Sequence, residues 1–349
     1  MSYTTIKKPS DYFNTKLYTG NATNPTTISG IGFQPDWVWT KLRAGGTEGH
    51  RLCDSVRGAT KDLLSNDTSG ELTNTIGLKS FNSDGYVIGN SNGYNFNNGT
   101  FASWNWKANG TGVANTDGSI NSTVRVNTTS GFSIVSYTGT GANATVGHGL
   151  GVAPAMMIIK KRNSATGSNW MVYHKSISGT GDGHIWLDLT NAKSTDVNSW
   201  NNTAPTSSVF SIGTRTENNG SGDTFIAYCF ADVQGFSKFG SYTGNGNADG
   251  TFVYTGFKPS LIIIKDTVNA GENWFIFDNK RPGYNFNANL LNPNSATTET
   301  TSGANGIDII SNGFKMRSTN NGTNRSGANF IYMAFASEPL VGDNPATAR

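Results

Sequence analysis

The sequence is poor in cysteine and in long apolar runs, and each shortage excludes a class of protein. Its two cysteines, Cys53 and Cys229, are too few and too unrelated in position for a disulfide framework, so we expect two buried thiols. No apolar run approaches the roughly 20 residues that a membrane-spanning helix requires. The first residues, MSYTTIKKPSDYF, lack an apolar segment of signal-peptide length, so secretion with a cleaved leader is not expected.

Charge is also scarce. Charged residues make up 14% of the chain, the net charge is +3, and lysine and arginine are scattered rather than clustered. A nucleic acid is therefore not an expected partner. Hydrophobic residues reach 35% and aromatic residues 11%, which is too apolar for an intrinsically disordered chain of low charge. Helical periodicity is almost missing, which leaves strands and turns as the expected structure.

What the sequence does contain is an internal repeat in three copies. Each copy has a Tyr-Thr-Gly turn, a proline 17 residues after the tyrosine and a lysine 6 residues after the proline. The copies begin 119 and 105 residues apart (18 to 137 to 242), and 43 glycines lie mostly in the segments between apolar runs. We call these nine residues the repeat signature: Tyr18, Pro35, Lys41, Tyr137, Pro154, Lys160, Tyr242, Pro259 and Lys265.

The apolar run between the signature proline and lysine predicts a strand. In the third copy it is Leu261 to Ile264, which suits a strand buried on both faces. A proline at the start of the run fits, because proline lacks an N–H and belongs at a strand's first residue or edge. We interpret the signature lysine as a strand-terminal charge that discourages edge pairing, in preference to a binding role.

Strand-length runs every 8 to 12 residues, separated by turns rich in glycine and asparagine, predict an all-β chain. We expect three tandem β-sandwich domains of about 100 residues, jelly-roll-like, with an immunoglobulin-like sandwich left open. Repeats 2 and 3 should abut stiffly across Val233 and Gln234, and repeat 1 should sit on a longer connection. The expected segments are an arm (1–11), repeat 1 (12–108), a linker with a possible hairpin at Asp117-Gly118 (109–130), repeat 2 (131–232), repeat 3 (235–339) and a tail (340–349).

Two local features are expected inside repeat 1. Asp62 to Leu64 is interpreted as a short helical turn, and SDGYVIG from Ser83 as a β-hairpin. Most of the eight tryptophans lie at positions that recur between repeats, where core packing explains them. Trp186 and Trp200 have no counterpart in repeat 3 and lie near loop-like sequence. They are therefore the candidate ligand contacts, since an indole ring can stack on a sugar.

No pattern of catalytic or metal-binding residues is present. A glycosidase needs two carboxylates held in a cleft, but the 23 acidic residues lie mostly in turns and none recurs in all three repeats. His174, His184 and Asp188 could be drawn as a metal cluster, yet no HxH or HExxH spacing supports it, and all four histidines are expected at the surface or at strand ends. Glycine-rich segments precede strands rather than helices, so no phosphate loop is expected. The chain is predicted to be no enzyme and to hold no cofactor or metal.

Four longer stretches carry a resemblance. They are DSVRGATKDLLSNDTSGE from Asp54, SFNSDGYVIG from Ser80, SWNWKANGTGVANTDGSI from Ser103 and GFSIVSYTGTGANATVGHGLGVAPAMMIIKKR from Gly131. Together they resemble repetitive virion proteins of tailed bacteriophages, many of them from marine and cyanobacterial phages. The resemblance extends from Tyr12 to Pro339. It implies a virion protein of lectin-like β-sandwich modules, made in the host cytoplasm and oligomeric, with a trimer favoured and no catalytic residues carried over.

The leading functional hypothesis is a tail fibre or attachment protein that binds a cell-surface glycan or another receptor through its loops. Its partners would be other virion proteins, further copies of the chain and possibly host polysaccharide, without nucleic acid or membrane insertion. The alternative is a purely structural role as capsid decoration, head fibre or tail adaptor. A depolymerase tailspike is disfavoured, because it would be a β-helix with a short-period repeat rather than one of about 105 residues.

Overall fold

The structure is a computed structural model that describes residues 3–303, 305–343 and 345–347. Strands occupy 42% of the chain and helices 6%, so the expected all-β fold is confirmed. Each repeat folds into a large antiparallel sheet and a small one, with one or two single-turn helices between strands. Repeat 1 begins with a 3-10 turn, η1 (Pro9–Asp11).

The elements follow the sequence repeat closely. Repeat 1 contains β1 (Phe13–Thr19), β2 (Thr26–Ser29), β3 (Trp37–Ala44), β4 (Arg51–Asp54), β5 (Lys61–Leu64), β6 (Leu72–Thr73), β7 (Leu78–Asn82), β8 (Gly85–Ile88), α1 (Asn92–Asn95) and β9 (Thr100–Trp106). Repeat 2 contains β10 (Val113–Asn115), β11 (Ser122–Asn127), β12 (Phe132–Thr138), β13 (Ala144–Gly147), β14 (Met156–Lys161), β15 (Met171–His174), β16 (Gly183–Trp186), β17 (Ser194–Thr195), α2 (Val197–Trp200), β18 (Val209–Ile212), α3 (Thr216–Asn219) and β19 (Thr224–Phe230). Repeat 3 contains β20 (Ser237–Thr243), β21 (Phe252–Tyr254), β22 (Phe257–Asp266), β23 (Trp274–Asp278), β24 (Asn289–Leu290), β25 (Thr300–Thr301), β26 (Ile307–Ile310), β27 (Gly313–Met316), α4 (Asn321–Asn324) and β28 (Asn329–Pro339).

The three large sheets share one strand order, in which the first strand of the repeat pairs with the last. The order is β1-β9-β3-β4-β5-β6 in repeat 1, β12-β19-β14-β15-β16-β17 in repeat 2 and β20-β28-β22-β23 in repeat 3. The small sheets that face them are β2-β8-β7, β13-β18 and β21-β27-β26, and repeat 3 has a further two-stranded sheet, β24-β25. A separate apolar cluster fills the space between the two sheets of each repeat, so every repeat is a two-layer, sandwich-like unit.

The other face of each large sheet packs into a core that all three repeats share. Successive side chains on a strand point to opposite faces, and the signature strands obey this period. In β22, Leu261 and Ile263 enter the shared core while Ile262 and Ile264 enter the core of repeat 3. The strand is therefore buried on both faces, as the uninterrupted apolar run predicts. The repeats form parts of one core rather than units joined by linkers.

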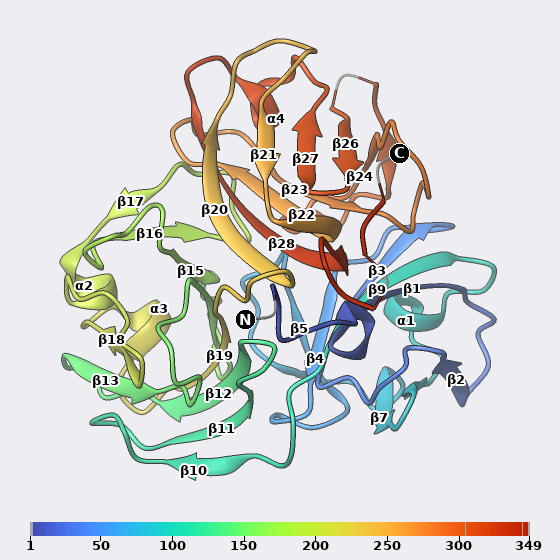
Figure 1. The fold of residues 1–349 in the computed structure, drawn as a ribbon. Coiled ribbons are helices and arrows are strands. Elements are labelled where there is room, and N and C mark those ends of the chain that lie inside the picture. Colours follow the sequence, from blue (N-terminus) through green and yellow to red (C-terminus); the bar gives the residue numbers. More distant parts are fainter. Residues whose placement is uncertain (1–2, 304, 344, 348–349) are drawn as a thin grey trace.

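Aromatic rings fill the centre of this shared core. Trp37 of repeat 1 stacks on Tyr228 of repeat 2, with ring centroids 4.2 Å apart. Phe13 stacks on Phe335 of repeat 3 at 5.1 Å, and Phe230 meets the edge of Phe335 at 5.9 Å. Figure 1 shows the result: repeat 1 (blue to teal), repeat 2 (green to yellow) and repeat 3 (orange to red) surround one centre.

Several expectations about the segments between repeats are wrong. The predicted linker supplies β10 and β11, which extend the large sheet of repeat 2, so no long flexible connection precedes that repeat. The predicted arm contributes Ile6, which is 1% exposed, to the shared core. Asp62 to Leu64 belongs to strand β5 rather than to a helical turn, because Leu63 points into the shared core. The hairpin from Ser83 is confirmed as β7 and β8.

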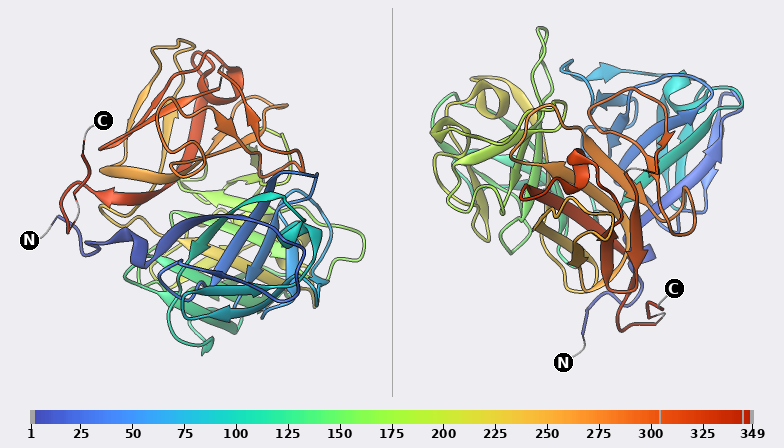
Figure 2. Two further views of the ribbon diagram at one scale, coloured as in Figure 1. Left: turned by 90° about the vertical axis from the view of Figure 1, so that its right-hand side faces the viewer. Right: turned by 90° about the horizontal axis from the view of Figure 1, so that it is seen from above.

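The first and last described segments lie at the same end of the molecule. Both views in Figure 2 place them together, on the side that faces the viewer in Figure 1. The backbone N–H of Asp343 donates to the carbonyl of Lys7 at 3.4 Å, and the Tyr3 hydroxyl donates to the carbonyl of Gly256 at 2.6 Å. Residues 1–2 of the predicted arm and residues 344 and 348–349 of the predicted tail lie outside the described residues.

Candidate functional site

The signature lysines lie at the junctions between repeats. Lys41, Lys160 and Lys265 are 0% exposed, and the strands that carry them are central strands with neighbours on both sides. The interpretation as charges at an exposed strand edge is therefore wrong. Burial lowers the pKa of each of the three ammonium groups to about 8.

Each signature lysine donates to backbone carbonyls of its own repeat and of a neighbouring repeat. The Lys160 Nζ donates to Thr68 of repeat 1 at 3.0 Å and to Ser168 of repeat 2 at 2.5 Å. The other two signature lysines make the same kind of contacts, each with the next repeat in cyclic order. Lys41 donates to Glu48 and to Ala296 of repeat 3, and Lys265 donates to Glu272 and to Thr190 of repeat 2. The lysines thus join repeat 1 to 3, repeat 2 to 1 and repeat 3 to 2.

The signature tyrosines and prolines act inside each repeat. The hydroxyl groups of Tyr18, Tyr137 and Tyr242 donate to carbonyls in α1, α3 and α4, at 2.8, 2.7 and 2.6 Å. Pro35 and Pro154 are buried just before β3 and β14. Pro259 lies within β22, where the pairing with β28 shifts register on both sides of it. A proline is tolerated at such an irregularity because no ladder hydrogen bond is required of it.

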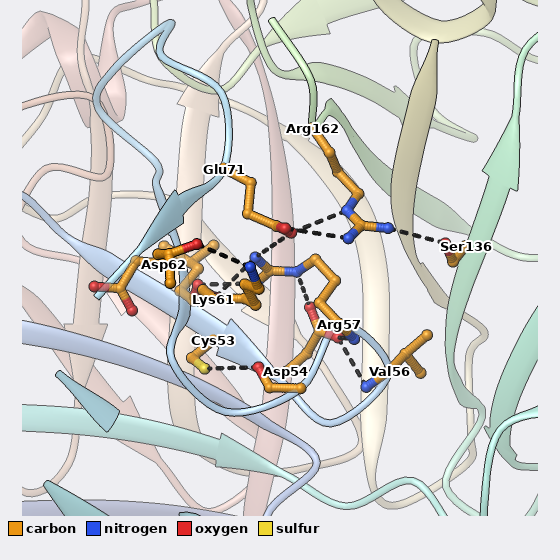
Figure 3. A network of polar contacts seen from close by, with 12 residues as sticks. Cys53, Asp54, Val56, Arg57, Lys61, Asp62, Glu71, Ser136 and Arg162 are labelled. Carbon is orange, nitrogen blue, oxygen red and sulfur yellow. Dashed lines mark hydrogen bonds and ion pairs between the residues drawn. The ribbon is translucent and has the colours of Figure 1, made fainter. Parts of the chain in front are cut away.

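A buried ion network lies at the junction of repeats 1 and 2 (Figure 3). Arg57 is paired with Asp54 through Nε, and both side chains are 0% exposed. Glu71 lies between two guanidinium groups, 3.3 Å from Nη1 of Arg57 and 2.9 Å from Nε of Arg162 in repeat 2. The Tyr228 hydroxyl of repeat 2 donates to Asp54 at 2.8 Å. Every charge in this network faces an opposite charge, which is the condition for burying such groups at acceptable cost.

The junction of repeats 3 and 1 repeats this network with different residues. Arg281 pairs with Asp278 at 2.6 Å and with Glu299 at 2.9 Å, and Glu299 pairs with Arg43 of repeat 1 at 2.8 Å. The indole N–H of Trp104 in repeat 1 donates to Asp278 at 3.2 Å, where Tyr228 donates at the first junction. Opposed carboxylates and guanidinium groups thus connect two of the three junctions.

Among the described residues, the junction of repeats 2 and 3 has no matching network of carboxylates and guanidinium groups. The backbone N–H of Lys193 donates to the carbonyl of Thr267, as Glu71 does to Arg162 and Glu299 does to Arg43, so Lys193 occupies the glutamate position. His174 occupies the aspartate position: its Nδ1 accepts from the Ser176 N–H at 3.1 Å, and its Nε2 lies 3.2 Å from the Tyr332 carbonyl. These two partners require a neutral imidazole, and burial lowers its pKa to about 4.

With this geometry established, comparison with protein families gives one match. A family model described as a domain of unknown function, DUF7483, matches residues 8–339. The chain belongs to the DUF7483 family. The match spans all three repeats and their junctions. No curated protein and no solved structure matches the chain.

The two tryptophans proposed as ligand contacts lie in different surroundings in this DUF7483 chain. Trp200 is 1% exposed, and its Nε1 donates to the Gly183 carbonyl at 2.9 Å, so it presents no face to a ligand. Trp186 is half-buried, with the Arg215 guanidinium 5.6 Å from its ring centroid and the His184 ring at 4.6 Å. Trp186 Nε1 and His184 Nε2 are buried and have no hydrogen-bond partner among the described residues, an arrangement that suits an ordered water.

The histidines and cysteines are all internal. His50, His148, His174 and His184 are 0% exposed, so an expected position at the surface is wrong. The expected position at strand ends holds for three of them: His174 ends β15, His50 precedes β4 and His148 follows β13. Cys53 and Cys229 are buried free thiols, as expected, and burial raises the pKa of Cys229 to about 12. Within the described residues, no three side chains of His, Cys, Asp or Glu gather as ligands for a metal ion. No helix in the same part of the chain is long and apolar enough to cross a bilayer.

Sequence reasoning missed the ion networks, although a signal for them was present. Asp-x-x-Arg follows the signature lysine by 13 residues in two repeats, from Lys41 to Asp54 and from Lys265 to Asp278. In the second repeat the residues at the matching places in the sheet are His174 and Ile177, and His174 lies 14 rather than 13 residues after Lys160. Both differences hide the pattern from a search that requires three copies. The glutamates at the centre of the networks lie at unequal distances from the lysines and carry no such signal.

Proposed function

We propose that this protein is a structural component of a tailed-bacteriophage virion and that it takes part in host attachment, as a tail-fibre component that binds a cell-surface glycan or another receptor. The observation that carries the proposal is the use of the repeat signature. All nine signature residues serve internal packing or the junctions, and none of them is an exposed residue of the asparagine- and glycine-rich loops between strands. A rigid scaffold with variable loops suits recognition.

The closure of three repeats around one core also bears on self-association. Three copies of a fibre protein commonly bury matching faces around a symmetry axis. Here the three repeats bury such faces within one chain, so a trimer of this protein would use its outer surfaces. The contact with other virion proteins would be made by the end of the molecule where the first and last described segments lie together. Virion localisation and the absence of enzymatic activity are part of the same proposal.

The experiment is cryo-electron microscopy of particles of the phage that encodes this chain, with any copies of the chain located and counted. A few copies at the tail are expected. Density repeated over the capsid lattice would replace the attachment role with decoration or a head fibre. Cell binding by the purified protein gives an independent measure, and a chain that is absent from the particle and binds no host cell contradicts the whole proposal.

A further inference from the structure

Repeat 3 carries an open pocket, one of several on the molecule; another of about 260 Å³ lies in repeat 2. The pocket in repeat 3 has a volume of about 230 Å³ and lies beside the segment between β23 and β24, which holds Tyr284 and Asn287. That segment has ten residues (279–288), whereas the matching segments have six in repeat 1 (55–60) and eight in repeat 2 (175–182). The pocket is smaller than the roughly 300–1,000 Å³ that encloses a drug-sized ligand, so it suits a single ring.

An aromatic ring stands at the edge of this pocket. Tyr284 is 68% exposed, more than any other large hydrophobic or aromatic side chain among the described residues. A large aromatic ring in water forfeits the apolar burial that normally keeps it inside. Its flat face and hydroxyl are therefore available to stack against and hydrogen-bond a partner.

A buried acceptor lines the same pocket. Asn287 is 1% exposed, and its Nδ2 donates to the Asp278 carbonyl at 2.8 Å, which fixes the orientation of the amide. Its backbone exchanges two hydrogen bonds with Ile307, each 2.9 Å long, so the residue is held in place. The Oδ1 is left buried and accepts no hydrogen bond from the described residues. Buried polar atoms normally have a partner, so this one suits a donor from outside the chain, either a water molecule or a ligand that displaces it.

The remaining lining residues set the charge of the ligand. Asn279 accepts from the Ser260 hydroxyl at 3.3 Å and contributes a second amide to the wall. Lys258 lies 3.6 Å from Glu338, and no Asp or Glu lines the pocket, so no unpaired charge calls for a charged ligand. A nucleotide would stack on the tyrosine, but its phosphate would compete with Glu338 for Lys258, the one cationic residue among the described lining residues. A neutral ring with hydroxyl donors and one apolar face fits all four side chains.

We propose that this pocket binds one sugar ring of a neutral carbohydrate, with the ring stacked on Tyr284 and a hydroxyl or amide N–H donating to Asn287 Oδ1. The inference rests on the proposed attachment function, because it assigns the glycan contact to a site. It moves that contact from Trp186 and Trp200 to repeat 3.

The test uses the full chain and a panel of methyl glycosides of glucose, galactose, rhamnose, N-acetylglucosamine and N-acetylgalactosamine. Saturation-transfer NMR and titration calorimetry measure binding to the wild type and to Y284A, Y284W, N279A and F252A. Phe252 is a matched control, since it is an exposed aromatic of repeat 3 (46%) that does not line the pocket. We expect Y284A to weaken binding by about tenfold, N279A to weaken it less, and Y284W and F252A to retain it. Thermal unfolding of each variant checks that the fold is intact.

Three other outcomes overturn the inference. Binding of equal strength by Y284A places the sugar elsewhere and leaves the attachment function standing. Binding that Y284W loses as fully as Y284A contradicts ring stacking. If the wild type binds no member of the panel, the pocket is not a sugar site, and the location of the protein on the particle then decides the proposed function separately.

Discussion

The strongest consequence of the structure is that a signature lysine stabilises the whole chain through a neighbouring repeat. We consider Lys160→Met, which keeps the length of the apolar stem and removes the ammonium group. The Lys160 Nζ donates to the carbonyls of Asp67, Thr68 and Ser168 and lies 5.4 Å from the ring centroid of Trp170. Its loss removes the donor for three carbonyls and the link from repeat 2 to repeat 1.

The magnitude follows from two opposing effects. Each buried carbonyl left without a donor costs roughly 1–3 kcal/mol, but the three carbonyls are only partly buried, so water replaces part of the loss. Removing a buried ammonium also returns its desolvation cost, which is the reason that its pKa is lowered to about 8. We expect a net destabilisation of about 3 kcal/mol. With an unfolding entropy of roughly 2.1 cal/mol/K per residue, the 349 residues give about 0.7 kcal/mol/K, so Tm should fall by about 4 °C.

The matched control is the neighbouring residue. Lys161 pairs with Asp223 at 2.6 Å, but both side chains are about one-fifth exposed (20% and 21%), and an ion pair near the surface contributes at most about 1 kcal/mol. Calorimetric unfolding of Lys160→Met and Lys161→Met should therefore differ by about 3 °C or more. Equal Tm values for the two variants would refute the reasoning that junction carbonyls depend on the signature lysine.

Three further predictions concern other parts of the core. His174 is neutral in the folded protein, with a pKa of about 4 against roughly 6.5 in the unfolded chain, so its contribution to folding stability is complete above pH 6.5 and is lost as the pH falls toward 4. The stability advantage of the wild type over H174N should therefore shrink by up to about 3 kcal/mol over that range. Parallel curves of stability against pH in chemical denaturation would contradict this. Cys53 and Cys229 should not react with a disulfide reagent at pH 8 in the native state and should both react in guanidinium chloride, so rapid native labelling would disprove their burial. I263D should lower the unfolding temperature of the entire chain in a single transition, because Ile263 enters the shared core and an unpaired buried charge costs several kcal/mol. Separate melting of repeat 3 alone would show that the repeats do not fold as one unit.

The parts of the fold that the sequence predicts are those with local causes. The all-β class follows from strand-length runs and turn residues, and the burial of Leu261 to Ile264 on both faces follows from an apolar run without alternation. The hairpin from Ser83 follows from a cluster of turn-forming residues: Ser83 and Asp84 make the turn, and Gly85 pairs with Asn82. These features are decided by a few consecutive residues, so a single sequence is enough to find them.

The features that the sequence does not predict arise from contacts between repeats. A lysine at the end of an apolar strand looks the same whether it faces water or the carbonyls of another repeat. Glu71 and Glu299 appear as ordinary loop residues until the chain closes and places each between two arginines. The candidate ligand contacts expected from the sequence also differ from those in the structure, because burial in the fold decides which side chains a ligand can reach. Trp200 is a candidate on sequence because it has no counterpart in repeat 3, yet in the structure it fills the core of its own repeat. Tyr284 lies in a segment that is longer than the matching segments of the other repeats, and that difference becomes visible only when the folded repeats are compared.

The junction of repeats 2 and 3 and the junction of repeats 3 and 1 differ both in charge and in how the chain connects them. Repeats 2 and 3 are adjacent along the chain and are separated by only Val233 and Gln234, so the covalent connection holds their sheets together at small entropic cost. That junction contains His174 and no buried glutamate. Repeats 3 and 1 have no direct connection, and the pair between Arg43 and Glu299 joins residues 256 positions apart. Closing the ring there relies on noncovalent contacts alone, and buried opposed charges at this junction favour one register because any displacement leaves a charge unpaired. The ion networks therefore contribute more to the specificity of closure than to its strength.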